Sequence, residues 1–149
     1  MTLKQWLENK WLSEHRTSPG EIRKLLKVIE RDIRDSQTTG ISADWKLAIA
    51  YNAILQCSVA ALAASGYRPV KGIGHHHYAI ESMRMTLGIS EDDVRTIGAF
   101  RKKRNIADYE MAGAVSSGEA QEIAELAEQI FGRLKSWLSE KHSDLLGTT

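Results

Sequence analysis

The feature that most constrains the fold of this chain is a run from Leu47 to Tyr67 that contains no charged residue. The run is long enough to span a bilayer. However, many of its apolar positions are alanine, and four polar residues interrupt it: Asn52, Gln56, Ser58 and Ser65. A central bundle helix that is apolar nearly all round gives the same pattern. Since the neighbouring amphipathic segments need such a helix to pack on, we predict a buried helix from Ser42 to Gly66 and no membrane span.

The segment before this run begins with a helix-start signal. Ser18 is a suitable N-cap, Pro19 stands at the first helical position and Glu21 follows at the third. Apolar residues then recur at three- and four-residue spacings: Ile22, Leu25, Leu26, Ile29 and Ile33. Charged residues occupy the opposite face, so the pattern predicts an amphipathic helix that ends near Gly40.

Three further helices are predicted after the run. An apolar stripe over residues 76–87 predicts one helix, which follows a loop bounded by glycines. Ser90, with three acidic residues in the next turn, begins another helix that continues into a charged stretch. A Gly/Ser break over residues 113–118 ends that helix, and Ser116 with Glu119 begins the last one.

Together these patterns predict an all-α fold, an antiparallel up-and-down bundle of about five helices over residues 18–141. No segment has the two-residue alternation of a strand. An N-terminal amphipathic arm is expected over residues 1–17, with its apolar face formed by Leu3, Trp6, Leu7 and Trp11. A frayed tail is expected over residues 142–149.

Composition excludes several classes of function. The 20 basic residues nearly balance the 19 acidic ones, and the formal net charge is +1. A globally basic nucleic-acid binder is therefore unfavoured, although a local basic patch fits. The single cysteine, Cys57, excludes an internal disulfide framework and a multi-cysteine zinc site. With no secretory signal pattern at the start, we predict a cytoplasmic protein.

The charged stretch on the fourth bundle helix is the most informative feature for function. At 100° per residue, one helix face carries Arg101, Arg104, Asn105 and Asp108, in line with the apolar stripe before them. Polar residues in line with a buried stripe must be paired, lie at a subunit interface or line a pocket. Two interpretations stay open: an Arg104–Asp108 salt bridge beside solvated lysines, or an arginine held so that its guanidinium grips a phosphate.

The stretch Arg104-Asn105-Ile106-Ala107-Asp108-Tyr109 resembles the HEPN family, the higher eukaryotes and prokaryotes nucleotide-binding domain. The likeness extends from about Glu21 to about Leu138. It rests on the order of a cationic helix, an Ala-rich helix, a Gly/His loop, an R-x-x-A-D-Y signature and a final amphipathic helix. It implies a helical bundle that forms a homodimer. It further implies a metal-independent ribonuclease, often a toxin paired with a nucleotidyltransferase-type antitoxin.

The resemblance also implies roles for individual residues. The family motif is R-x4-6-H, often with Asn after the Arg, and Arg104 and Asn105 match its first two positions. Arg104 would grip the scissile phosphate, Asn105 would orient the substrate and Asp108 would fix Arg104. Tyr109 takes the histidine position, where a phenol of pKa about 10 donates a hydrogen bond or serves as a weak base. The further RNA-binding cations would be Arg101, Lys102 and Lys103.

Tyr109 does not share a helix face with Arg104. Tyr109 lies five positions after Arg104, which is about 140° around an ideal helix. If the two act together, either the helix is distorted or the residues meet across a two-fold interface.

Three consecutive histidines begin the helix over residues 76–87: His75, His76 and His77. Consecutive positions point about 100° apart, so the three cannot bind one metal from a regular helix. His77 and Glu81 could supply two ligands without a third, and we predict neither a metal nor a cofactor. Whether a neutral histidine, Tyr51 or Asn52 reaches Arg104 stays open.

Two functions from different classes follow from these patterns. The first is an RNA-directed protein, either a metal-independent endoribonuclease or a catalytically reduced relative. The alternative is a non-catalytic module that binds a nucleotide or a partner protein at the same cleft. A third possibility is a structural protein in which Arg104 and Asp108 lock a dimer.

Overall fold

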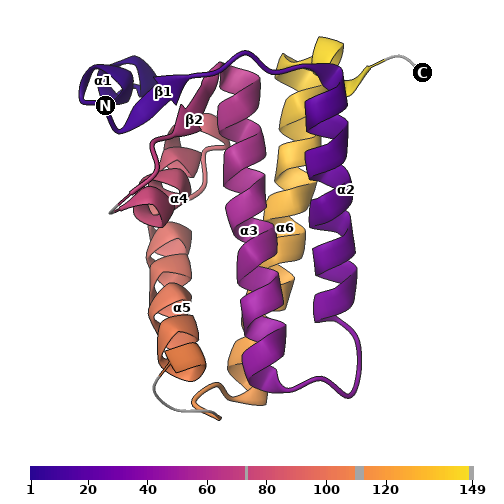
Figure 1. Ribbon diagram of the computed structural model, residues 1–149. Helices are drawn as coiled ribbons and strands as arrows, with labels where there is room; N and C mark the ends of the chain where they lie inside the picture. The colour runs from indigo at the N-terminus through magenta and orange to yellow at the C-terminus, as the bar shows by residue number, and fades with distance from the viewer. Residues whose placement is uncertain (73, 110–112, 148–149) are drawn as a thin grey trace.

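The computed structural model describes the backbone of residues 1–72, 74–109 and 113–147, and their side chains except those of residues 106–109 (Figure 1). The helices are α1 (Leu3–Glu8), α2 (Pro19–Ser36), α3 (Ala43–Ser65), α4 (His75–Thr86), α5 (Glu91–Tyr109) and α6 (Ser117–Lys141), followed by the 3-10 helix η1 (Ser143–Leu146). The strands are β1 (Leu12–Glu14) and β2 (Tyr67–Pro69). The predicted all-α class is confirmed, and α2 to α6 are the five helices predicted for the bundle.

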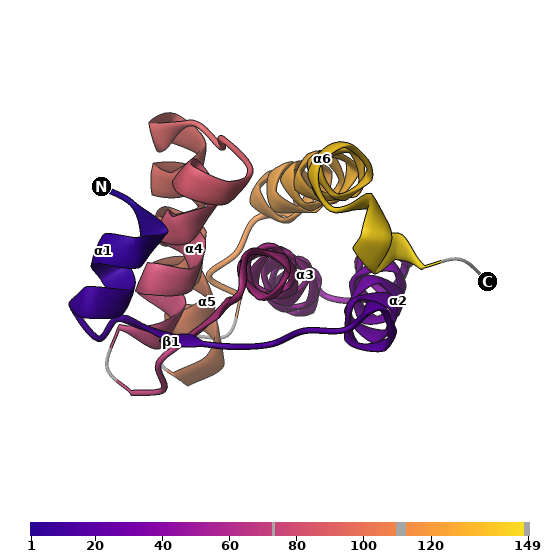
Figure 2. The same cartoon turned by 90° about the horizontal axis from the view of Figure 1, so that it is seen from above.

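Helix α3 lies at the centre of the molecule. Seen along the bundle, α2 and α6 cover one side of it, while α4 and α5 cover the other (Figure 2). The helix is long and apolar enough to cross a membrane, yet 67% of its most apolar 18-residue window is buried inside the protein. It is therefore a buried core helix, as predicted from its small and apolar residues.

The predicted helix starts are confirmed by their caps. The Ser18 side chain accepts a hydrogen bond from the Glu21 backbone N–H at 3.2 Å. Ser42 caps α3 in the same way, and Ser116 forms a reciprocal capping box with Glu119. One boundary differs, because α2 ends at Ser36, a turn before the glycine expected to end it.

The N-terminal arm differs from the sequence prediction. Within the amphipathic arm expected over residues 1–17, only Leu3–Glu8 is helical, and β1 then pairs antiparallel with β2, with Leu12 opposite Pro69. Strands of three residues are too short to show an alternating pattern, so no feature of the sequence predicts them. The pairing places the indole of Trp11 in a stack on the Tyr78 ring, with centroids 4.8 Å apart.

The C-terminal tail also differs in part. Residues Ser143–Leu146 form the 3-10 helix η1, and Leu145 packs against the main core. The predicted fraying is therefore wrong for these four residues, because the partly buried Leu145 helps to hold this short turn against α2 and α6.

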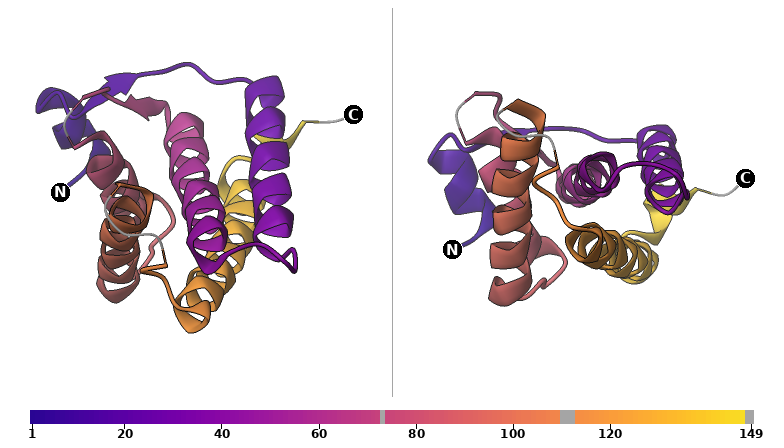
Figure 3. Two further views of the ribbon diagram at one scale, coloured as in Figure 1. Left: turned by 60° about the horizontal axis from the view of Figure 1, so that its bottom comes forward. Right: turned by 90° about the horizontal axis from the view of Figure 1, so that it is seen from below.

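The two sides of α3 form different layers. Helices α2, α3 and α6 make a compact three-helix unit, and α4 and α5 lie beside it as a second layer (Figure 3). Helix α5 contacts both α3 and α4. The second layer is thus positioned by α3, and the candidate site lies within it.

Candidate functional site

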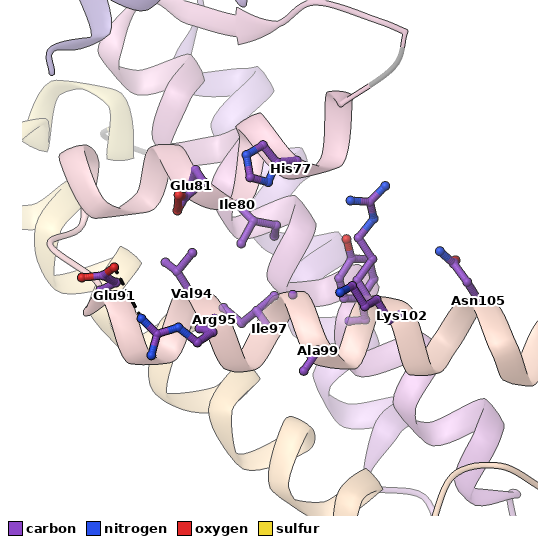
Figure 4. A pocket seen from close by; sticks show the side chains of 13 residues that line it. His77, Ile80, Glu81, Glu91, Val94, Arg95, Ile97, Ala99, Lys102 and Asn105 are labelled. Carbon is purple, nitrogen blue, oxygen red and sulfur yellow. Dashed lines mark hydrogen bonds and ion pairs between the residues drawn. The ribbon is translucent and has the colours of Figure 1, made fainter.

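A cavity of about 670 Å³ lies between α4 and α5 (Figure 4). Its lining residues come from α3, α4 and α5: Tyr51, His77, Ile80, Glu81, Glu91, Val94, Arg95, Ile97, Gly98, Ala99, Arg101, Lys102 and Asn105. The cavity follows the helix face that the sequence marked, where polar residues continue an apolar stripe. Two of the four residues on that face, Arg101 and Asn105, line the pocket, and a third, Arg104, lies over the Tyr51 ring.

The two ends of this pocket differ in chemistry. Glu81, Glu91 and Arg95 lie at one end, and Lys102 and Asn105 lie at the other (Figure 4). Apolar side chains separate the two ends: Ile80, Val94, Ile97 and Ala99. The pocket therefore combines a polar group at each end with an apolar middle, an arrangement typical of a site for an organic ligand that carries charge.

Tyr51 joins the pocket to the cations on α5. Its ring is fully buried, and the Arg104 guanidinium carbon lies 4.9 Å from the ring centroid, in cation–π geometry. Its hydroxyl lies 3.3 Å from Nδ1 of His76 on α4. Burial raises the pKa of the Tyr51 phenol, opposed by the positive charges of Arg101 and Arg104. Tyr51 is therefore a neutral hydrogen-bonding group at pH 7.

The surroundings of His76 favour its neutral form. Burial lowers the pKa of its imidazole, and the nearby charges of Arg104, Arg101 and His75 lower it further. In one tautomer the Tyr51 hydroxyl donates to Nδ1. In the other, Nδ1–H donates to the Tyr51 oxygen, and Nε2 carries the lone pair that can accept a proton. The structure thus brings a histidine to the arginines, a possibility that the sequence left open.

The predicted cations separate into two groups. Arg101 and Lys102 line the pocket, and Arg104 lies beside Tyr51. Lys103 instead forms an ion pair with Glu119 of α6, with Nζ and Oε2 3.4 Å apart. The helix thus presents Arg101, Lys102 and Arg104 to the site, whereas Lys103 points to a neighbouring helix.

Three further predicted residues complete the set from α5. Asn105 lines the cationic end of the pocket. The side chains of Asp108 and Tyr109 lie outside the described part of the chain, so their predicted roles stay predictions.

Asn52 belongs to a different part of the molecule. Its side-chain amide donates to Asp32 Oδ2 on α2 at 2.8 Å. The other oxygen of this buried carboxylate accepts two bonds from Arg31, at 3.1 and 3.0 Å. Asn52 therefore stabilises the α2–α3 contact, and its neighbour Tyr51 is the α3 residue that reaches the site.

Other reactive groups of the described chain do not converge on the pocket. Among the described residues, no three His, Cys, Asp or Glu side chains are grouped so as to hold a metal ion. Cys57 is buried, and burial raises the pKa of its thiol. It is thus a packing residue in α3.

Sequence reasoning gave no role to Glu81 beyond a metal ligand, and left Tyr51 and His76 as open possibilities. A tyrosine within a run of small apolar residues was the available signal for Tyr51. For His76 the signal was its place on the apolar stripe of its helix. Neither signal indicates which helix packs against these residues. That information comes from the packing of α4 and α5 on α3.

No protein-family model matches this chain, and no curated protein gives a significant match. The resemblance to the HEPN family therefore rests on the sequence features given above.

Proposed function

We propose that this chain is a HEPN-like, RNA-directed protein that cleaves RNA without a metal ion. The observation that supports the proposal is the convergence of two arginines, Arg101 and Arg104, and the neutral imidazole of His76 around Tyr51. Arginine suits a phosphate because its planar guanidinium offers several donors in a fixed geometry. A neutral imidazole suits proton removal near pH 7.

In the proposed reaction, Nε2 of His76 accepts the proton of a ribose 2′-hydroxyl. The 2′-oxygen attacks the adjacent phosphorus, and the bond from phosphorus to the 5′-oxygen breaks. The products are a 2′,3′-cyclic phosphate and a 5′-oxygen that takes a proton from water. The imidazolium then returns its proton to solvent. Arg104 and Arg101 stabilise the charge that develops on the phosphate oxygens.

His76 replaces the residue that the family motif places on α5. The motif position for histidine holds Tyr109, whose phenol is a poor base near pH 7. With His76 as the base, Tyr109 has the role of a hydrogen-bond donor, and Asp108 that of orienting Arg104. Asn105 at the pocket end would orient the substrate.

The rest of the proposal concerns partners and setting. We propose a homodimer, a nucleotidyltransferase-type antitoxin as the protein partner, and the cytoplasm as the compartment. RNA-binding cations are Arg101 and Lys102. Lys103 contributes less, because its ammonium is paired with Glu119.

The test is cleavage of total tRNA and of a long transcript by purified protein in EDTA. We expect cleavage that disappears in Arg104→Ala and in His76→Gln and persists in the control variant Lys103→Ala. Equal melting temperatures and equal oligomeric states would show that these variants are folded. RNA affinity should also fall steeply with salt. Cleavage that His76→Gln leaves unchanged contradicts the role of His76, and absence of cleavage by the wild type contradicts the nuclease.

One observation favours a second candidate, a non-catalytic module that binds a nucleotide or a partner protein. Tyr109 stands where the motif has histidine, and a chain that lost its base could keep its phosphate-binding arginines. This module would bind RNA or a nucleotide with Arg104 and leave it intact. The same cleavage assay, combined with a binding measurement, separates the two candidates.

A further inference from the structure

Glu81 is one of the pocket residues that the proposed cleavage does not use. It lies on α4, at the end of the pocket away from Lys102 and Asn105 (Figure 4). Its Oε2 atom is buried and has no hydrogen-bond partner among the described residues. Arg95, at the same end, is paired with Glu91 at 3.5 Å and with Asp92. A buried acceptor without a donor is unfavourable, and a ligand that donates a hydrogen bond to it would remove that cost.

The space between Glu81 and the cationic end suits a planar ring. Ile80, Val94 and Ile97 line this middle part of the pocket, and apolar side chains of this kind pack well against an aromatic face. Along α5, Arg101 lies six positions after Arg95, which is a rise of about 9 Å between the two ends. This length is comparable with the reach of a nucleotide from its phosphate to the outer edge of its base.

The chemistry of a carboxylate selects among the four bases. An ionised carboxylate has two acceptor oxygens and no donor. Guanine alone presents two neighbouring donors on its pairing edge, the N1–H and the 2-amino group. Adenine and cytosine place an acceptor ring nitrogen beside their amino group, and uracil places its single N–H between two carbonyls. Each of these three would set an acceptor against the carboxylate.

We propose that the pocket binds a guanine nucleotide, with Glu81 accepting the N1–H and 2-amino hydrogen bonds. The base would lie on Ile80, Val94 and Ile97, and its phosphate would lie at the Arg101 end. This inference rests on the proposed function for the phosphate end of the site. It adds that the RNA is cleaved next to guanosine.

The first test is calorimetric titration in EDTA with the 3′-monophosphates of guanosine, inosine, adenosine, cytidine and uridine. We expect guanosine to bind more tightly than adenosine, cytidine or uridine by roughly 5- to 150-fold, the range for one bidentate contact. Inosine lacks the 2-amino group, so we expect an intermediate affinity. Guanosine 5′-monophosphate, titrated alongside, shows on which side of the scissile phosphate the base lies. Equal affinities for all bases would overturn the proposal.

The second test uses Glu81→Gln, with Glu91→Gln as the matched control at the same end of the pocket. The amide can accept from one donor but opposes the other, so we expect the guanine preference to disappear while phosphate affinity remains. Glu91→Gln should keep the preference, since Glu91 pairs with Arg95. A preference that Glu81→Gln leaves unchanged contradicts this inference.

The two proposals can fail separately. If no RNA is cleaved but the guanine preference depends on Glu81, the nuclease proposal fails and the guanine site stands. If RNA is cleaved next to all four bases alike, the guanine site fails and the nuclease stands. The inosine comparison needs no variant, so it remains decisive if Glu81→Gln does not fold.

Discussion

Tyr51 and Asn52 are neighbours on α3, yet they serve two regions of different character. Asn52 faces α2, where its amide closes on the buried Asp32 carboxylate at 2.8 Å. Tyr51 faces α4 and α5, where its hydroxyl is hydrogen-bonded to His76 and its ring makes a cation–π contact with Arg104. Consecutive helix positions point about 100° apart, so one helix can serve both sides.

The two sides of α3 differ in what their polar side chains face. On the α2–α6 side, a buried carboxylate is bonded to Asn52 and Arg31, and the surrounding side chains are apolar. On the α4–α5 side, carboxylates, cations and a phenol surround a cavity. A polar network that satisfies itself stabilises a fold, whereas one directed at a cavity is available to a ligand. We therefore expect stability to depend on the first side and binding on the second.

The largest expected effect comes from the apolar core of the α2–α6 side. Leu134 of α6 is fully buried. Leu134→Ala should lower the free energy of unfolding by about 2–5 kcal/mol, because it removes buried methyl groups and leaves a cavity. Urea denaturation measures this change. Nucleotide affinity of the folded fraction should stay the same, and a loss of affinity in that fraction would show that the two sides are coupled.

A smaller effect is expected at the polar contact between α2 and α3. Asn52→Ala removes one hydrogen bond to the buried Asp32 carboxylate and should cost about 1–3 kcal/mol. Asn52→Asp should cost more, since it places a second carboxylate against the first. Thermal and urea unfolding of both variants measure which of them loses more stability. If Asn52→Ala weakened RNA or nucleotide binding at unchanged stability, the assignment of Asn52 to the structural side would be wrong.

The smallest effect on stability is expected on the site side, where the change appears as a pH dependence. The charge of Arg101 is one of the causes that lower the pKa of His76, after burial and Arg104. Arg101→Gln should therefore raise that pKa toward its ordinary value of 6.5. It should change the free energy of unfolding by less than about 0.5 kcal/mol. The base works in its neutral form, so activity rises as pH increases through this pKa.

The rising limb of the pH–activity profile should accordingly move to higher pH in Arg101→Gln, as should the histidine titration followed by NMR. Lys103→Ala is the matched control, because it removes a cation of the same helix that pairs with Glu119 instead of facing the site. A shift of equal size in the control would mean that net charge, and not the position of Arg101, sets the pKa of His76.

Much of the fold could be predicted because its signals are local. Caps such as Ser18, Ser42 and Ser116 start helices through contacts within one turn, and apolar spacing shows which face is buried. The alanines and the four polar residues of the uncharged run predict a buried central helix and not a membrane span. The strand pairing of Leu12 with Pro69 joins distant segments, and neither short strand carries a pattern that would reveal it.

The site could be predicted in part for the same reason. Arg101 and Asn105 belong to the helix face that continues the apolar stripe, and both line the pocket. Lys102 lines it as well, although the pattern did not place it on that face. The opposite wall depends on the packing of α4 and α3 against α5. The sequence left His76 as an open possibility and considered Glu81 only as a metal ligand. Their places at the site follow from the packing, since nothing in the residues near them indicates which side chains of other helices lie beside them.

The pairing of β1 with β2 has a consequence for the order of folding. It joins Leu12 to Pro69 and closes a loop that contains all of α2 and α3. Closing a long loop costs chain entropy, and the few contacts of a short strand pair do not offset this cost while the loop is still unfolded. We expect the α2–α3 hairpin to form first and the strand pair afterwards. Pulse-labelled hydrogen exchange should then show the amides of Leu12 to Glu14 protected later than those of α3, which makes the start of the chain among the last parts to fold.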